Sequence, residues 1–240
     1  MPLRILVDRL QKHTTLTPEE REALAGMHSV ERTLSDGECV VYQSDRTSQC
    51  TIVLSGLLVR RKLVGSRNQI IAICIPGDFT DLQTLHLPVM DHDIASIGSS
   101  RVALISHAAL GRILDKFPRL AHLFWRDALI EAALFREWVC IVGARDAIAR
   151  VSHLICELAA RLEAVGLLKD NEFHTPLTQQ NIADATGLSA VHVNRTVQEL
   201  RRSGLISWEN REVTLIKRAE LEALADFSGD YLHQRADGDD

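Results

Sequence analysis

Three side chains that can bind DNA lie close together in the second half of the chain: His192, Asn194 and Arg195. Asparagine and arginine pair with base edges in the major groove, and all three side chains can also donate to phosphate oxygens. Arg201 follows in the same stretch. We expect these side chains to contact DNA.

An amphipathic helix is needed to present these donors outward. Val193, Val197 and Leu200 recur at i, i+4 and i+7, a spacing that predicts a helix with one buried face. Ser189 precedes the helix and is a good N-cap, because its hydroxyl accepts a backbone N–H of the first turn. The long donor at Arg195 then lies on the outward side.

A shorter helix comes before this one. Thr178 is its expected N-cap, and Ile182 and Ala183 form its apolar face. Gly187 ends it with a tight or left-handed backbone. Helices this short, joined by a short turn, must cross steeply, and the small side chain of Ala183 permits the close approach. The pattern predicts a helix-turn-helix, whose second helix enters a DNA major groove.

The residues after Arg202 predict a β-hairpin. Two apolar runs, 205–208 and 213–215, flank the turn residues Glu209 and Asn210. A hairpin behind a DNA-reading helix is the wing of a winged helix. The alternative, an ordinary pair of helices in a helical core, accounts neither for the outward donors nor for the hairpin.

The charge balance is acidic, which is unusual for a DNA-binding chain. The 240 residues have a net charge of −5 and are 46% hydrophobic, which allows one large or two ordinary globular domains. Much of the acid lies in the tail, Asp237-Gly238-Asp239-Asp240, which we expect to be frayed, and around Glu220 and Glu222. Residues 178–218 contain six basic and four acidic residues, so the expected DNA face is mildly positive.

Cysteine usage and the N-terminus indicate the compartment. The five cysteines are scattered and form no CxxC pair, as is typical of reduced intracellular thiols. The start, MPLRILVDRLQ, has charges inside its short apolar run and is therefore not a signal peptide. No uncharged apolar stretch approaches the roughly 18 residues that a membrane helix needs. We expect a soluble, cytoplasmic protein with no membrane contact.

The first half of the chain changes its hydrophobic period. Residues 1–30 predict peripheral helices, one beginning at Thr17-Pro18-Glu19-Glu20, with Leu24 and Met27 facing inward. From Val30 to about Ser106 the period is two. Strand-like segments are expected at 39–42, 51–60, 69–75 and 93–105, separated by turns at 36–37, 55–56, 65–66, 76–77 and 98–99. Short strands with regular turns suggest an antiparallel sandwich or barrel such as a jelly roll.

Helices return after Ser106. One is expected at 107–114, and a long one begins at Pro118 and runs to about Val142. Its apolar residues occupy more than the ~100° stripe that one core requires. A second copy of the chain is the economical partner, so we expect a two-fold dimer with Ile130 and Leu134 in the interface. A hinge at 143–145, an amphipathic helix from Asp146 to near Gly166, and a last helix at 218–227 complete the predicted order.

This order of barrel, long helix, hinge and winged helix resembles bacterial transcription regulators of the cyclic-AMP receptor and fumarate–nitrate regulator (Crp/Fnr) family. The most specific segment is QQNIADATGLSAVHVNRTVQELRRSGLI, supported by Gly37-Glu38, Ser55-Gly56-Leu57 and Pro76-Gly77-Asp78. The resemblance implies an α+β chain in three parts. These are an antiparallel β jelly-roll sensor domain resembling cyclic-nucleotide-binding domains over 1–116, a dimerisation helix and hinge over 117–143, and a winged helix-turn-helix over 144–240.

The resemblance also implies partners and contacts. Family members bind two-fold symmetric double-stranded DNA as homodimers, and RNA polymerase is an expected partner if the chain activates transcription. Gln179 and Ser189 match phosphate-contacting positions, Arg195 matches an arginine that contacts DNA, and His192 matches a DNA-facing position. The full set of expected DNA contacts is Thr178, Gln179, Ser189, His192, Asn194, Arg195 and Arg201.

The recognition helix departs from the family pattern at two positions. Many members carry an arginine and a glutamate after its serine, and these read bases. This chain has Ala190 and Val191 there, whose side chains cannot hydrogen-bond. Base reading by hydrogen bonds must then shift to His192, Asn194 and Arg195.

The sensor departs from the pattern as well. Cyclic-nucleotide binders carry an arginine followed by serine or threonine, which clamps the cyclic phosphate. This chain has Met90-Asp91-His92-Asp93-Ile94-Ala95 in the corresponding stretch. Carboxylates there would repel a phosphate instead of forming a charge-assisted pair. We expect no cyclic-AMP binding and no bound cofactor.

The signals for iron–sulfur, haem, metal or redox chemistry are weaker than those for DNA binding. An iron–sulfur cluster of the family's type would need N-terminal cysteines, and none precedes Cys39. Cys74, His86 or His92 could bind a haem iron, but a lone cysteine or histidine is more often a packed or surface residue. The acidic residues and histidines of 78–93 could bind a metal ion, but such residues in loops are more often solvated. Cys140 is more often a small buried residue than a redox switch between subunits.

An enzyme is not expected, because the chain has no Ser/His/Asp set, phosphate-binding glycine loop or HExxH motif. The alternative function is an effector-binding signalling module that uses the barrel without DNA. The winged helix argues against that alternative.

Overall fold

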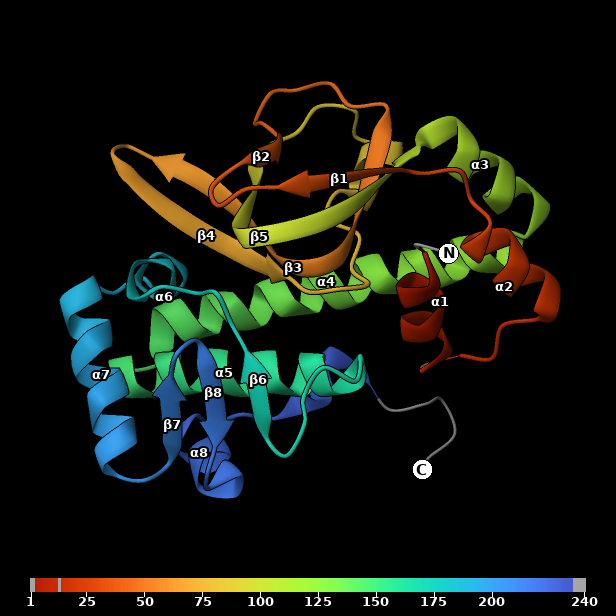
Figure 1. The fold of residues 1–240 in the computed structure, drawn as a ribbon. Helices are drawn as coiled ribbons and strands as arrows, with labels where there is room; N and C mark the ends of the chain where they lie inside the picture. Colours follow the sequence, from red (N-terminus) through yellow and green to blue (C-terminus); the bar gives the residue numbers. More distant parts are fainter. Residues whose placement is uncertain (1–2, 13, 235–240) are drawn as a thin grey trace. The chain divides into compact units, whose positions relative to one another are not determined.

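The computed structural model describes residues 3–12 and 14–234 and divides them into two compact units (Figure 1). The first unit comprises the described residues of Met1–Lys62 and Ala72–Ala132, with Gln234. The second comprises Leu63–Ile71 and Ala133–His233. The acidic tail Asp237–Asp240 lies outside the described residues.

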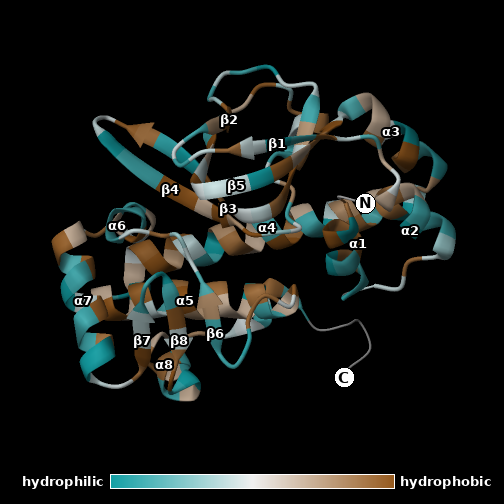
Figure 2. Cartoon of the chain, in the orientation of Figure 1, coloured by the Kyte–Doolittle hydropathy of each residue, from teal (hydrophilic) through white to brown (hydrophobic). Residues whose placement is uncertain are grey.

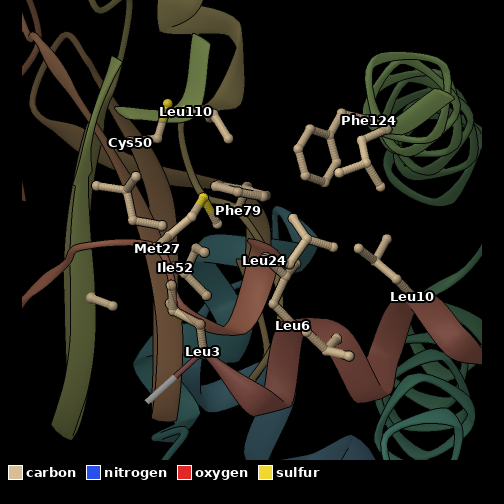
Figure 3. Close-up of a cluster of buried hydrophobic side chains, with 14 of the residues drawn as sticks. Leu3, Leu6, Leu10, Leu24, Met27, Cys50, Ile52, Phe79, Leu110 and Phe124 are labelled. Atoms are coloured by element: carbon tan, nitrogen blue, oxygen red, sulfur yellow. The ribbon is translucent and has the colours of Figure 1, made fainter. Parts of the chain in front are cut away.

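Two helices open the first unit, and both contribute to its core. They are α1 (Arg4–Gln11) and α2 (Pro18–Ala25), the second capped by a Thr17–Glu20 capping box with proline at its start. The inward position of Leu24 and Met27 is confirmed, since both are buried. Their outer faces are exposed, as expected of peripheral helices, and their inner faces are buried. Leu6 and Leu10 point into the main apolar cluster with Leu24 and Phe124 (Figure 3), because a helix with an apolar stripe must bury it.

The strands of the first half of the chain form one antiparallel sheet in the order β1-β5-β3-β4, with β2 also paired to β5. Their bounds are β1 Val30–Leu34, β2 Cys39–Val41, β3 Gln49–Val64, β4 Arg67–Cys74 and β5 Asp93–Ser106. A short 3-10 helix, η1 (Leu82–Leu85), lies between β4 and β5. The sequence pattern located four of these strands and missed β1, whose exposed residues hide any alternation.

Two predicted turns are bulges inside long strands. Gly56 lies within β3 and Gly98 within β5, and the pairing register shifts between Val53 and Leu57. Both glycines have positive φ, +81° and +68°. A β-bulge uses glycine for the same backbone reason as a turn, so the two cannot be distinguished from sequence. The strands bend there instead of reversing.

Arg60 and Asp81 are charged residues that are buried in the first unit. Arg60 donates to the Thr80 carbonyl (2.7 Å) and pairs with Glu131. Asp81 accepts from the Thr51 N–H (2.6 Å) and hydroxyl (2.9 Å). The interpretation of the 78–93 acids as solvated is therefore wrong for Asp81, and burial raises the pKa of this carboxyl to about 6. Among the described residues, no group of three His, Cys, Asp or Glu could hold a metal ion.

The helices after the sheet are α3 (His107–Lys116), α4 (Pro118–Ala144) and α5 (Ala147–Ala164). Helix α4 continues through Gly143, so the expected hinge is shorter than predicted and is confined to Arg145 and Asp146. The Asp146 carboxylate accepts the Ala149 N–H (2.9 Å) and starts α5 as an N-cap. No helix of the described residues is long and apolar enough to span a membrane.

The second unit is a helical core with a small sheet. After α5 come β6 (Glu172–His174), α6 (Gln179–Thr186), α7 (Ala190–Arg202), β7 (Ile206–Glu209), β8 (Glu212–Leu215), α8 (Arg218–Leu224) and η2 (Gly229–Leu232). The antiparallel sheet has the order β6-β8-β7. Strand β6 was not predicted, because three residues are too few to show a period, and the last helix ends earlier than expected. Figure 2 shows hydrophilic and hydrophobic residues alternating along α7.

The glycine at the β3 bulge gives a stability prediction. A Cβ added at Gly56 would lie 2.6 Å from the Ser99 carbonyl oxygen and 2.8 Å from the Ser100 Cα, both backbone atoms. With the strain of positive φ, Gly56→Ala should lower the free energy of unfolding by about 3 kcal/mol or more. Urea unfolding measures this loss.

The control for this prediction is Gly65→Ala. Gly65 also has positive φ (+61°), but an added Cβ meets nothing within 4 Å. Only the backbone strain remains, so the expected loss is about 1 kcal/mol. Equal losses for the two variants would contradict the close approach of β5 to Gly56.

Candidate nucleic-acid interface

Helices α6 and α7 are joined by a turn that depends on one glycine. Gly187 has φ +69° and its N–H bonds the Ala183 carbonyl, which ends α6. The Leu188 N–H bonds the same carbonyl at 3.2 Å. A Cβ added at Gly187 would lie 3.4 Å from Val142 Cγ1, so the turn also packs closely on the end of α4. The left-handed end predicted at Gly187 is confirmed.

Both helices have side-chain N-caps. Thr178 and Asn181 form a capping box, in which the Thr178 hydroxyl accepts the Asn181 N–H and donates to the Asn181 side chain (2.7 Å). The Ser189 hydroxyl accepts the His192 N–H (3.2 Å). Thr178 therefore uses its hydroxyl within the cap, whereas the Ser189 hydroxyl hydrogen remains for an external acceptor. Gln179 is exposed at the first turn of α6.

The two faces of α7 are separate. The inner face consists of Val193, Thr196, Val197 and Leu200, all buried. The outer face consists of Val191, His192, Arg195, Glu199 and Arg202, all exposed, and Asn194 lies half-buried at its margin. Arg195 forms no hydrogen bond or ion pair with any described residue. Three expected contacts, His192, Asn194 and Arg195, are therefore brought together, with Arg195 central.

Arg201 lies apart from this cluster. Its guanidinium donates to Glu209 Oε1 (3.1 Å) and so links α7 to the wing. Arg202 is exposed on the same face as Arg195 but was not among the expected contacts. Its spacing of i+7 from Arg195 is the signal that could have identified it.

The wing hairpin turns one residue later than predicted. Glu209 and Glu212 pair across β7 and β8, which leaves Asn210 and Arg211 as the two-residue loop. Both have positive φ, 51° and 70°, as a type I′ turn requires. Asn210 indicated the turn in the sequence. The arginine at position 211 gave no sign that it is the second residue of the loop, so the turn was predicted one residue too early. Arg211 is exposed at the tip.

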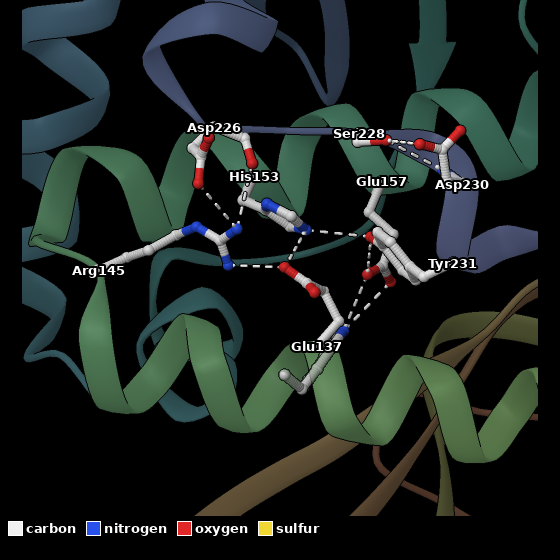
Figure 4. Close-up of polar contacts among 9 residues, drawn as sticks. Glu137, Arg145, His153, Glu157, Asp226, Ser228, Asp230 and Tyr231 are labelled. Carbon is white, nitrogen blue, oxygen red and sulfur yellow. Dashed lines mark hydrogen bonds and ion pairs between the residues drawn. The ribbon is translucent and has the colours of Figure 1, made fainter.

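A buried polar network includes residues of α5, the helix that contacts both α6 and α7 (Figure 4). The Trp138 indole N–H donates to both Glu157 oxygens, at 3.2 and 3.0 Å. The Tyr231 hydroxyl donates to Glu157 Oε2 at 2.8 Å. Burial raises the pKa of Glu157, against donors and Arg161, which lower it. The network joins α4, α5 and the C-terminal segment within this unit.

His153 is the titratable centre of the same network. Its Nε2 lies 3.0 Å from the Tyr231 hydroxyl, and since that hydroxyl donates to Glu157, the Nε2 must carry the hydrogen. Its ring is fully buried against Phe227 and Tyr231. Burial lowers the pKa of His153 to about 4, with Arg145 adding to the shift and Glu137 opposing it. His153 is therefore neutral near pH 7.

Arg145, at the break between α4 and α5, is also held in place. It donates to Glu137 Oε1 (2.7 Å) and to the Asp226 carbonyl (3.1 Å). These contacts join the end of α4 to the segment after α8. The position of the break is therefore defined by contacts of the Arg145 side chain with α4 and with the segment after α8.

Comparisons with known proteins agree with this geometry. Residues 149–224 match the Crp-like helix-turn-helix domain. The chain is 30% identical over 192 residues to the nitrogen fixation regulation protein FixK of Bradyrhizobium diazoefficiens, covering 80% of each protein. The chain belongs to the Crp/Fnr family of DNA-binding transcription regulators.

Other relatives of this Crp/Fnr regulator also match most of the chain. The transcriptional activator protein FnrL of Cereibacter sphaeroides is 23% identical over 217 residues, covering 88% of this chain and 86% of FnrL. The structure of FixK2 from Bradyrhizobium japonicum shares the fold, with a TM-score of 0.76 and 21% identity over 84% of this chain and all of that one. Both the sensor-like sheet and the C-terminal winged helix therefore fall within the family's fold.

Asp91 and Asp93 of this Crp/Fnr regulator depart from the pattern of cyclic-nucleotide binders, and the structure shows their partners. Asp91 accepts from His92 (2.7 Å) and lies 3.8 Å from Lys62, and Asp93 lies 3.6 Å from Arg61. These carboxylates are thus paired with side chains of the unit itself. Cys140 is exposed on α4, so its interpretation as a residue buried within the chain is wrong.

The buried histidine gives a pH prediction. Unfolded histidine takes a proton near pH 6.5, whereas folded His153 takes one only near pH 4. The unfolded state therefore binds more protons between these values, so stability falls as the pH falls through this window. The contribution of His153 to the unfolding free energy should drop by about 2 kcal/mol between pH 7 and 5.

Comparison with His153→Phe removes this contribution, because phenylalanine carries no titratable group, whereas groups outside the network titrate alike in both proteins. Urea unfolding at pH 7, 6 and 5 should show a shallower pH dependence for the variant. Val30→Ala, at an exposed residue of the other unit, is the control and should keep the wild-type slope. Parallel slopes for wild type and His153→Phe would show that His153 is not buried as described.

Proposed function

We propose that the protein regulates transcription as a homodimer that binds a two-fold symmetric DNA site through the outer face of α7. The observation that carries this proposal is the unpaired Arg195, flanked by exposed His192 on a helix whose opposite face is buried. A structural helix in a core would have no such free donors. Its place of action is the cytoplasm, where the DNA lies.

The three functional parts follow the family's order. Residues 1–116 form the sensor, 117–143 the dimerisation helix, and 144–240 the DNA-binding domain, which includes the break at Arg145 and Asp146. These functional boundaries differ from the division into compact units, which falls within α4 at Ala132 and Ala133. A helix that belongs to both units suits a part that connects sensing to DNA binding.

The expected contacts divide into two kinds. Gln179 and Ser189, at the N-termini of α6 and α7, suit phosphate oxygens, because free backbone N–H groups and the helix dipole favour anions there. Thr178, whose N–H and hydroxyl both bond Asn181, contributes by holding the first turn of α6. His192, Asn194 and Arg195 suit base edges. Arg201 contributes through Glu209, which it holds beside α7.

The sensor is proposed to work without cyclic AMP, because Asp91 and Asp93 stand where a phosphate clamp would be needed. FnrL is named a transcriptional activator. If this chain also activates, RNA polymerase is its further partner. No observation favours the alternative of a signalling module without DNA binding.

Dimerisation is proposed through α4, which exposes large apolar side chains along one stripe. Trp125 is 65% exposed, Leu129 56% and Val139 72%. Their spacing of four and ten residues keeps them on one side of the helix. Ile130 and Leu134, the residues expected from sequence, are half-buried within the chain. The stripe of Trp125, Leu129 and Val139 is therefore the better interface.

Leu129→Glu with Val139→Glu should give folded monomers, because both positions are exposed within the chain and charges would be buried in the dimer. Sedimentation velocity should show the halved mass, and DNA affinity should fall by at least tenfold. The control pair is Val30→Glu with Leu87→Glu, exposed apolar positions that are not part of α4. A double variant that remains dimeric would exclude this interface.

Arg195→Ala should weaken binding to the selected DNA site most among single α7 variants. Loss of one good base contact costs about 1–3 kcal/mol, so a symmetric dimer should lose about 2–6 kcal/mol. The fold should keep its melting temperature, because the side chain is exposed without a partner.

Arg211→Ala is the comparison, since Arg211 lies at the wing tip and alanine has the same strain there. It should weaken binding less and reduce its salt dependence. Fluorescence anisotropy and thermal melting measure both variants. Wild-type affinity for Arg195→Ala, or a loss explained by unfolding, would refute the role of α7.

A further inference from the structure

The first turn of α7 exposes an apolar side chain for which the fold has no use. Val191 is 65% exposed, and Ser189 and His192 beside it are exposed as well. A β-branched residue is a poorer helix former than most polar ones, and at this exposure it adds little to the core. The fold would accept a polar residue here at least as well.

The position of Val191 places it beside the central donor. Val191 and Arg195 are separated by four residues and so lie one turn apart on the same face. Side chains on a helix lean toward its N-terminus, so Val191 covers the end that begins at Ser189. In a helix-turn-helix that end enters the major groove.

Only one base offers this side chain an apolar partner of matching size. In the major groove thymine presents its C5-methyl group, whereas guanine, adenine and cytosine present polar atoms. An apolar side chain against a polar edge would leave that edge without a hydrogen bond. Valine is also stiff about χ1, so little rotamer freedom is lost when it packs.

We propose that Val191 recognises a thymine in each half-site through its C5-methyl group. This inference rests on the proposed function and adds a base preference that no hydrogen-bond donor of α7 supplies. It assigns a specificity role to a position that sequence considerations left without one. Arg195 and Val191 would then read neighbouring bases by different chemistry.

The experiment begins with the full-length protein and a pool of random duplexes, from which bound sequences are selected. Each thymine of the enriched half-site is then replaced in turn by deoxyuridine, which lacks only the methyl group. At one thymine, replacement in both half-sites should weaken wild-type binding about 15-fold. This is about fourfold per half-site, the effect of one lost methyl contact.

Val191→Ala should bind the unmodified site more weakly by a similar factor and respond to that same replacement by less than about twofold. Val30→Ala, at an exposed valine of the other unit, is the matched control and should retain the full response. Melting temperatures should be equal for all three proteins.

The outcomes separate the two claims. If an enriched site is found but wild type and Val191→Ala respond equally to every replacement, the inference is overturned and DNA binding stands. If wild type enriches no sequence, the proposed function fails and the inference fails with it. Loss of response confined to Val191→Ala at one thymine establishes the contact.

Discussion

The burial of one face of α7 determines every contact that this helix can make. Val193 and Leu200 are fully buried and Val197 nearly so, against α5, α6 and β7. Each such side chain contributes about 1.5–3 kcal/mol, so rotation of the helix about its axis is strongly opposed. Because one residue corresponds to about 100°, this burial alone directs Arg195 and Val191 outward.

Helix α5, which α7 contacts, is itself held in place by polar contacts. Glu157 is buried and accepts from Trp138 and Tyr231, which fixes α5 relative to the end of α4 and to the C-terminal segment. Such a network is stabilising only while every member has its partner. The neutral state of His153 belongs to that requirement, since a buried imidazolium beside Arg145 would be repelled.

The sequence was sufficient where a signal is local. The caps at Thr178 and Ser189 and the left-handed Gly187 follow from residue type and spacing, and the structure confirms them. The sequence was misleading where one residue type occurs in two kinds of backbone structure. Gly56 and Gly98 signalled turns but form bulges, because both structures need positive φ.

The remaining features depend on tertiary context and could not be predicted. Burial of Asp81 and Arg60 arises from partners distant in sequence, and acidic residues in a loop give no sign of it. Similarly, the three residues of β6 become a strand only by pairing with β8. The exposure of Val191 could not be predicted either, because the hydrophobic period assigns this valine neither to the buried face nor to the exposed face of the helix.

The central claim is that α7 reads the major groove of a two-fold site. Dimethyl sulfate probing of the selected site tests it directly, because the reagent methylates guanine N7 in the major groove and adenine N3 in the minor groove. The account predicts that the bound protein protects guanine N7 atoms in two patches about 34 Å apart, one per half-site. Protection confined to adenine N3 atoms, or a single patch of N7 protection, would contradict it.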